Sequence, residues 1–213
     1  MAKDNILDQF LTTMPIIAIL RGLTPDMAGI VGRALMAGGI TAMEVPLNEA
    51  DATACIGKLR EVAGGNALIG AGTVTRAKTV HVAASAGAAF AVAPNTDRDM
   101  ITACLTDNIV PVAGVFTPSD AFTAIKAGAT YLKVFPAFAV TPAGMNAMKV
   151  VMPSSVRLLA VGGVDRGNIE DWHNAGAFGF GIGSALYEPG DDAERVEAKA
   201  RLITEAVREL KKT

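Results

Sequence analysis

The chain has 213 residues, of which 51% are hydrophobic, and this is enough apolar sequence to bury one large core. Its formal net charge is -2, with basic and acidic residues interspersed, so nothing indicates binding to nucleic acid or to an anionic membrane. No apolar run is long enough to span a bilayer, and the N-terminus lacks the apolar core of a signal peptide. We therefore expect one cytoplasmic domain over residues 1–213 whose partners are small molecules.

Eight short apolar runs alternate with helical patterns along the chain, after an amphipathic N-terminal stretch at about residues 4–13. The runs begin near Ile16, Thr41, Ala67, Ala89, Ile109, Thr130, Val156 and Ala177. Strands that are apolar on both faces and are joined by helices indicate a parallel sheet. Eight such units predict an α/β fold, a single compact (β/α)8 or TIM barrel, with the N-terminal helix covering its bottom.

Capping residues predict where several of these helices begin and end. N-cap residues, some followed by proline, stand at Thr24, Thr75, Thr96-Asp97, Thr117, Thr141 and Asp165. Glycines that tolerate a left-handed conformation close helices at Ala37-Gly38-Gly39, Ala86-Gly87, Ala127-Gly128 and Ala175-Gly176. Cys55 and Cys104 fall in helical segments, and we interpret them as buried, inert thiols rather than a disulfide.

Chemistry in such a barrel lies at the carboxyl ends of its strands, and charged residues interrupt three of these apolar segments. Arg21 follows the first strand, Glu44 lies in the second and Lys133 lies in the sixth. A desolvated lysine has a lowered pKa, and its neutral amine can attack a ketone to form a Schiff base. Glu44 beside it would act as a proton shuttle. The alternative is a structural salt bridge between Glu44 and Lys133, or a lysine that extends to water.

Glycines follow the seventh and eighth predicted strands. Gly162, Gly163, Gly183 and Ser184 offer backbone N–H groups at two neighbouring strand ends, where barrels commonly bind phosphate. Glycine is also common in tight turns that bind no ligand. A phosphate site is therefore predicted only because Gly162-Gly163 and Gly183-Ser184 occur together at neighbouring strand ends.

A metal-dependent mechanism has little support in the sequence. His81 and His173 fall in helical segments away from the strand ends, and no cluster of carboxylates suits a hard cation. Gly70-Ala71-Gly72-Thr73 does not complete a dinucleotide-binding motif either. We therefore expect neither a metal nor a cofactor.

Five segments resemble the 2-keto-3-deoxy-6-phosphogluconate and 2-keto-3-deoxy-6-phosphogalactonate aldolases, in order and at family spacing from about Pro15 to Tyr187. These segments are Ile17–Gly22, Glu44–Asn48, Gly70–Val74, Leu132–Pro136 and Ala160–Val164. The resemblance implies a class I aldolase, commonly a trimer, that cleaves a phosphorylated keto sugar acid into pyruvate and glyceraldehyde 3-phosphate.

The resemblance also assigns roles to individual residues. Lys133 would be the Schiff-base lysine and Glu44 the general acid/base, while Arg21 and Thr73 would hold the carboxylate or nearby hydroxyls. The phosphate would lie at Gly162, Gly163, Gly183 and Ser184.

Two positions are similar to the galactonate branch. Asn48 stands where gluconate-type members usually carry Arg, and Val161 where they carry Thr. Cleavage of the gluconate epimer or of 4-hydroxy-2-oxoglutarate is the nearest alternative. A sugar-phosphate isomerase or epimerase that uses Glu44 as its base, and a non-catalytic metabolite-binding barrel, are more distant ones.

Overall fold

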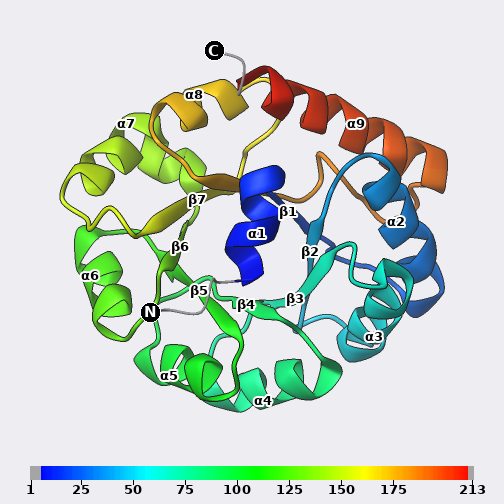
Figure 1. Cartoon of the computed structure of the whole chain (residues 1–213), viewed down its shortest axis with the longest axis horizontal. Coiled ribbons are helices and arrows are strands. Elements are labelled where there is room, and N and C mark those ends of the chain that lie inside the picture. The colour runs from blue at the N-terminus through cyan, green and yellow to red at the C-terminus, as the bar shows by residue number, and fades with distance from the viewer. Residues whose placement is uncertain (1–5, 211–213) are drawn as a thin grey trace.

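The expected closed barrel is confirmed by the computed structural model, which describes residues 6–210. Parallel strands pair in chain order from β1 to β8, and β8 closes the barrel against β1 (Figure 1). The strands are β1 (Ile16–Ile19), β2 (Ala42–Pro46), β3 (Leu68–Gly72), β4 (Phe90–Val92), β5 (Val110–Val115), β6 (Tyr131–Val134), β7 (Arg157–Val161) and β8 (Gly179–Ile182). Each begins within two residues of its predicted start.

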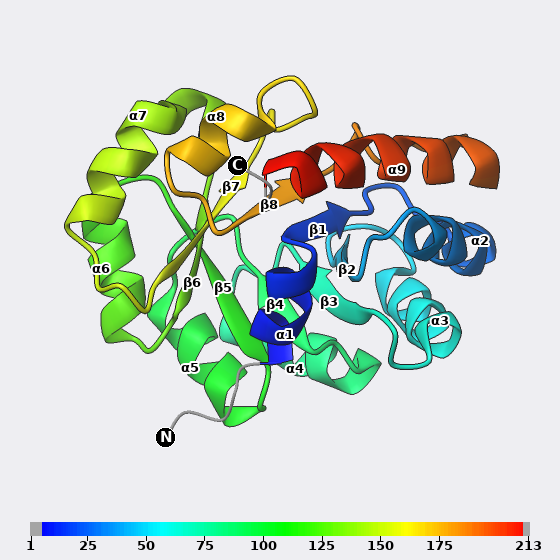
Figure 2. The same cartoon turned by 45° about the horizontal axis from the view of Figure 1, so that its top comes forward.

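Helices form the outer ring, with α9 lying alongside α2 and α8 (Figure 2). The helices of the ring are α2 (Pro25–Ala37), α3 (Ala52–Ala63), α4 (Ala77–Ala86), α5 (Arg98–Thr106), α6 (Pro118–Lys126), α7 (Ala137–Val150), α8 (Ile169–Asn174) and α9 (Ala193–Leu210), whereas α1 (Ile6–Thr13) lies at one end of the barrel. None of these helices is both long and apolar enough to cross a membrane.

Alternation of side chains along each strand separates two buried regions. On β6, Leu132 and Val134 pack outward against the helices, whereas Tyr131 faces the barrel interior. Lys133 has the same parity as Tyr131, and its side chain therefore also points inward. By the same argument Glu44 points inward, because Ala42 belongs to the interior cluster while Met43 and Val45 belong to the outer one.

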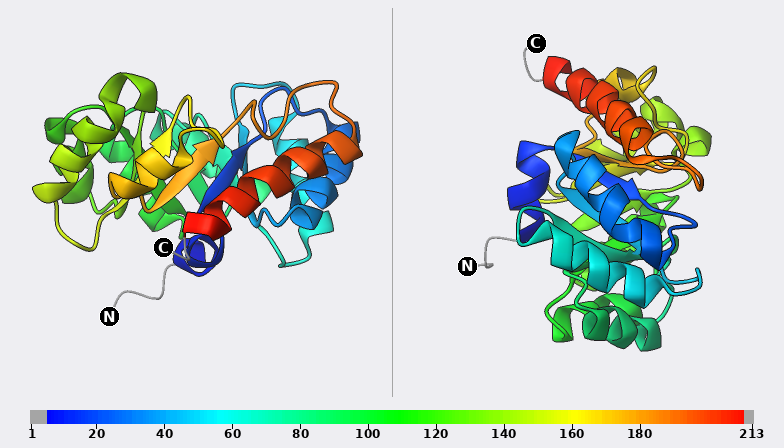
Figure 3. Two further views of the ribbon diagram at one scale, coloured as in Figure 1. Left: turned by 90° about the horizontal axis from the view of Figure 1, so that it is seen from above. Right: turned by 90° about the vertical axis from the view of Figure 1, so that its right-hand side faces the viewer.

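Helix α1 covers one end of the barrel, as expected from the sequence. Leu7 and Leu11 are almost fully buried and pack with interior residues such as Leu68 and Phe90. Figure 3 shows α1 on one side of the strands, with the arrowhead of β8 directed toward the opposite side. The carboxyl ends of the strands are therefore at the end of the barrel away from α1.

Several predicted helix boundaries are confirmed and two are wrong. Asp97 and Thr117 cap α5 and α6 through their side chains, and Gly87, Gly128 and Gly176 have positive φ after α4, α6 and α8. Both cysteines are buried and free.

The two wrong boundaries have local causes. The N-cap of α4 is Arg76 rather than Thr75. Asp165 does not begin α8, because its side chain accepts a hydrogen bond from the backbone N–H of Gly167 and forms a turn. That helix begins only after Asn168.

Candidate active site

A cavity of about 460 Å³ opens at the carboxyl ends of the strands. It is lined by all nine residues predicted as site residues, which come from loops and strands far apart in sequence. These are Arg21, Glu44, Thr73, Lys133, Val161, Gly162, Gly163, Gly183 and Ser184. The barrel therefore brings the predicted set to one place.

Lys133 places its amine at the inner end of this cavity. The residue is only 7% exposed, and burial lowers the pKa of its ammonium, an effect that nearby Arg21 reinforces and Glu44 opposes. The Nζ atom lies 4.4 Å from the centroid of the Phe135 ring. The strand register fixes its position, since Lys133 pairs with Gly114 on β5 and Leu159 on β7.

Glu44 is buried more deeply still, at 2% exposure. Burial raises the pKa of its carboxyl group to about 7, although the positive charges of Lys133 and Arg21 act in the opposite direction. Its Oε2 atom is buried and has no hydrogen-bond partner. A carboxyl group in this state can both donate and accept a proton near neutral pH.

The two groups are close enough to influence each other's pKa but do not form a direct salt bridge. Among residues 6–210, no ion pair within 4.0 Å joins Glu44 to Lys133. The structural salt bridge considered as an alternative is therefore wrong, and so is a lysine that extends to water. Desolvation dominates both pKa values because no ion pair compensates it.

Arg21 differs from the other two charged residues. It lies two residues beyond the end of β1, as expected of a residue that follows the first strand, and its side chain is 58% exposed, whereas Glu44 and Lys133 are buried. Its Nη1 donates a hydrogen bond to Oε1 of Glu49 at 2.7 Å. Glu49 therefore holds the guanidinium at the rim of the cavity, where its remaining donors stay available to an anionic ligand.

Backbone conformation distinguishes the other lining residues. Thr73 has a φ of 55°, which is uncommon for a residue other than glycine and often marks functional sites. Gly162 and Gly163 follow β7 with φ of 104° and 76°, so the chain turns there without side chains that would narrow the cavity.

The sequence argument missed several lining residues. Ile19, Pro94, Phe135, Val164, Asp165, Gly181 and Ala185 also line the cavity. Ile19 in β1, Gly181 in β8 and Phe135 directly after β6 each lie two residues along the strand direction from a predicted site residue. Strand alternation would therefore have placed each of the three on the same face as its predicted neighbour.

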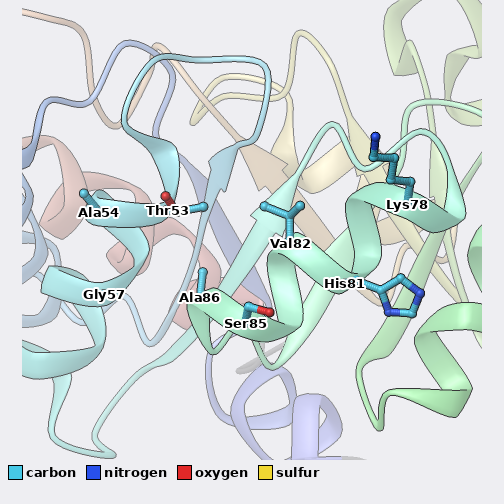
Figure 4. A pocket seen from close by; sticks show the side chains of 8 residues that line it. All are labelled: Thr53, Ala54, Gly57, Lys78, His81, Val82, Ser85 and Ala86. Carbon is cyan, nitrogen blue, oxygen red and sulfur yellow. The ribbon is translucent and has the colours of Figure 1, made fainter.

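A wider hollow of about 850 Å³ lies outside the barrel, between α3 and α4. Figure 4 shows Lys78 and His81 pointing away from Thr53 and Ala54 at its edge. His81 is largely exposed and is 2.7 Å from a carboxylate oxygen of Asp107. The hollow holds no buried titratable side chain, so it lacks the chemical features of the barrel cavity.

An inward-facing amine and an unpaired carboxyl group at the mouth of a (β/α)8 barrel define a class of protein that acts on small carbonyl compounds. Comparison with known families agrees with this class. Residues 7–199 match the model of the KDPG and KHG aldolases. The chain belongs to this family.

Two curated relatives carry a more particular name. The chain is 39% identical to the 2-dehydro-3-deoxy-6-phosphogalactonate aldolase of Escherichia coli (strain K12), over 94% of this chain and 98% of the relative. It is 43% identical to a probable 2-dehydro-3-deoxy-6-phosphogalactonate aldolase of Rhizobium meliloti (strain 1021), over 87% of this chain and 88% of the relative. The resemblance to the family is thereby confirmed.

Solved structures agree with the sequence comparison. A native KDPGal structure superimposes with a TM-score of 0.91 at 38% identity, covering 94% of this chain and 97% of that one. The KDPG aldolase of Legionella pneumophila, solved with pyruvate captured as a covalent carbinolamine intermediate, superimposes with a TM-score of 0.79 at 28% identity. That match covers 94% of this chain and 96% of the other.

Proposed function

We propose that this protein is a class I aldolase that cleaves 2-dehydro-3-deoxy-6-phosphogalactonate into pyruvate and glyceraldehyde 3-phosphate, within one barrel domain. The observation that carries the proposal is the pair of buried groups at the cavity. Burial lowers the pKa of Lys133, which favours the neutral nucleophile, and holds the pKa of Glu44 at about 7. The family and its covalent pyruvate intermediate in a relative support the same chemistry.

The reaction begins when the neutral amine of Lys133 adds to the C2 ketone and forms a carbinolamine. Protonated Glu44 assists the loss of water, which leaves an iminium ion and a Glu44 carboxylate. The carboxylate takes the proton of the C4 hydroxyl group while the C3–C4 bond breaks and its electron pair moves into the iminium. Glyceraldehyde 3-phosphate leaves, the enamine is protonated at C3, and water releases pyruvate from Lys133.

Positioning of the substrate falls to the rim of the cavity. Arg21, held by Glu49, and Thr73 are placed to bind the carboxylate or nearby hydroxyl groups. The phosphate would lie against the backbone at Gly162, Gly163, Gly183 and Ser184, where small residues let an oxyanion approach the main chain. No metal takes part in this scheme.

We assign the galactonate epimer as the substrate rather than the gluconate epimer for two reasons. Asn48 and Val161 match the galactonate branch, and two relatives at 39% and 43% identity are named for that substrate. An isomerase or epimerase would need Glu44 as a base but would not form a covalent bond at Lys133. The covalent step therefore separates the aldolase from that alternative and from a non-catalytic barrel.

We also propose that the protein is a homotrimer and lies in the cytoplasm. Phe116, Phe122 and Phe138 are exposed by 49%, 37% and 70% along the segment from β5 to α7, and aromatic side chains of this kind would be covered if chains associate through this segment. Sedimentation equilibrium should give three times the 21.9 kDa mass of one chain. A monomer mass at micromolar concentration would refute the trimer.

Turnover tests the proposed reaction. The purified protein should release pyruvate from the phosphorylated substrate with or without exhaustive chelation. The unphosphorylated substrate should lose at least ~100-fold in kcat/KM, about 2.7 kcal/mol of transition-state binding. Lys133→Met should abolish the reaction, and Lys126→Met, a change on α6, serves as control. Equal kcat/KM for the phosphorylated and unphosphorylated substrates would contradict the phosphate site, and an active Lys133→Met variant would refute the mechanism.

A further inference from the structure

Gly72 lies at the end of β3, next to the carboxyl group of Glu44 on β2. In the register of these two strands Glu44 pairs with Gly70 and Pro46 pairs with Gly72. Alternation therefore places Gly70 and Gly72 on the same inward face as Glu44. The side chain of Glu44 reaches along that face toward the cavity.

A Cβ atom at position 72 would lie 1.6 Å from Oε2 of Glu44, 2.3 Å from its Cδ and 2.6 Å from Oε1. All three distances are far below van der Waals contact, so the carboxyl group occupies the volume that any other residue at position 72 would fill. The backbone of Gly72 has no positive φ, and glycine is therefore not required there for conformational reasons. Space for Glu44 is what requires it.

We propose that Gly72 is a positioning residue that provides the slot in which the Glu44 carboxyl group stays buried. This inference rests on the proposed function for its effect on catalysis, but the slot itself is a property of the fold. A Cβ at position 72 would push the carboxyl group out of the slot and toward the open cavity, which water reaches. The group that exchanges protons with the substrate would then be misplaced and better solvated.

Two consequences separate this role from a general structural one. Attack by Lys133 on pyruvate depends less on Glu44 than bond cleavage does, so the imine should still form when the carboxyl group moves. Proton transfer at the C4 hydroxyl group should fail, because a general base must lie within hydrogen-bond reach of that proton. The pKa of Glu44 should also fall, since its rise depends on burial.

The test compares Gly72→Ala with Gly57→Ala, where a Cβ on helix α3 would meet nothing within 4 Å. We expect Gly72→Ala to keep its circular dichroism spectrum and a borohydride-reducible pyruvate adduct, while kcat falls by about 100-fold or more. Gly57→Ala should match the wild type. A kcat of Gly72→Ala within threefold of the wild type would overturn the proposal.

A readout independent of turnover keeps the slot testable if the protein proves not to be an aldolase. Carboxyl ¹³C NMR, assigned with Glu44→Gln, should show the pKa of Glu44 lower in Gly72→Ala than in the wild type by about one pH unit or more. An unchanged value would overturn the proposal whatever the enzyme's activity.

A double variant covers the case in which Gly72→Ala does not fold. Glu44→Asp shortens the side chain by one methylene group and withdraws its carboxyl group from the clash. Combined with Gly72→Ala, it should recover folding, measured as a higher midpoint of urea unfolding than that of Gly72→Ala alone, whereas turnover should stay low because the shortened side chain no longer reaches the C4 hydroxyl group. A double variant no better than Gly72→Ala would overturn the proposal, because the clash would then involve other atoms.

Discussion

Glu44 is a carboxyl group that the fold keeps away from water without giving it a hydrogen-bond partner. Its ionised form is therefore disfavoured, and the cost appears as a pKa of about 7 instead of 4.5. A pKa that is higher in the folded than in the unfolded state makes stability depend on pH. The stability that folding gains from keeping Glu44 protonated is fully present below pH 4.5, and it is lost as the pH rises through 7.

Glu44→Gln should remove this pH dependence, because an amide does not ionise. Relative to the wild type, the variant should become more stable between pH 4.5 and pH 7 by up to about 3 kcal/mol, and the difference should level off above that range. Urea unfolding of both proteins at pH 5 and pH 8 measures it. Glu61→Gln, which alters an exposed residue, is the control. A difference that does not grow with pH would contradict the burial of an unpaired carboxyl group.

Val161 is the residue that we expect to influence the choice of epimer. Its side chain lines the cavity and is 5% exposed. Exchange for Thr replaces a methyl with a hydroxyl group that could hydrogen-bond the C4 oxygen in one configuration. Val161→Thr should therefore shift the ratio of kcat/KM toward the gluconate epimer by about 1 to 3 kcal/mol, the scale of one pocket contact. An unchanged ratio for the two phosphorylated epimers would show that other residues choose between them.

Some site residues could be predicted from the sequence and others could not, for a physical reason. Lys133 and Glu44 stand out because a charge in an apolar strand is costly. Phe135 and Ile19 do not, because an apolar residue in an apolar strand looks the same whether it faces a cavity or the core. Gly72 stood in a recognised motif, but its role depends on how β3 is aligned with β2, which only the structure provides.

At the scale of elements, α7 contains a break that the sequence only partly revealed. Thr141 was predicted to begin a helix at Pro142, and this is confirmed: its φ of 68° and ψ of 157° are non-helical and separate the short helical segment that begins at Ala137 from the helix that follows Thr141. This backbone region is close to exclusive to glycine and costs about 1 to 3 kcal/mol for other residues. The hydroxyl group of Thr141 accepts a hydrogen bond from the N–H of Gly144 at 3.3 Å, which offsets part of that cost.

Thr141→Gly should therefore raise the stability of the protein, by about 1 kcal/mol after the lost hydrogen bond and the entropy of glycine are counted. In a chain of this size that corresponds to a rise in Tm of about 2–4 °C. Thr141→Ser keeps both the hydroxyl group and the strain and should change Tm much less. A lower Tm for Thr141→Gly would show that the break in α7 is not strained.

Strand positions followed from the sequence more closely than helix boundaries did. A buried parallel strand leaves a continuous apolar run, and this run is bounded on both sides by polar turns. A cap depends on which of several polar side chains reaches a free N–H group, as Asp165 illustrates by forming a turn before α8.

For the whole molecule, the interior of the barrel is a column with an apolar base and a charged top. Helix α1 covers the base, and Leu11 contributes a side chain that is 1% exposed. Leu11→Ala should lower the free energy of unfolding by about 2 to 5 kcal/mol. The neighbouring change Ile6→Ala, at a residue that is 43% exposed, should cost far less.

Because α1 and the cavity lie at opposite ends, Leu11→Ala should leave kcat/KM nearly unchanged at temperatures where the variant is folded. Urea unfolding and steady-state kinetics on the same preparations measure both quantities. Equal losses of stability in the two variants would refute the role of Leu11 as part of the base.

Reduction by borohydride in the presence of pyruvate tests the central claim most directly, because borohydride reduces an iminium and leaves an ion pair unchanged. Peptide mass mapping should find one reduced pyruvyl group on the peptide that carries Lys133, and no adduct in Lys133→Met. An adduct on Lys126 or Lys149, or no adduct on any lysine of the wild type, would contradict the assignment of Lys133 as the nucleophile.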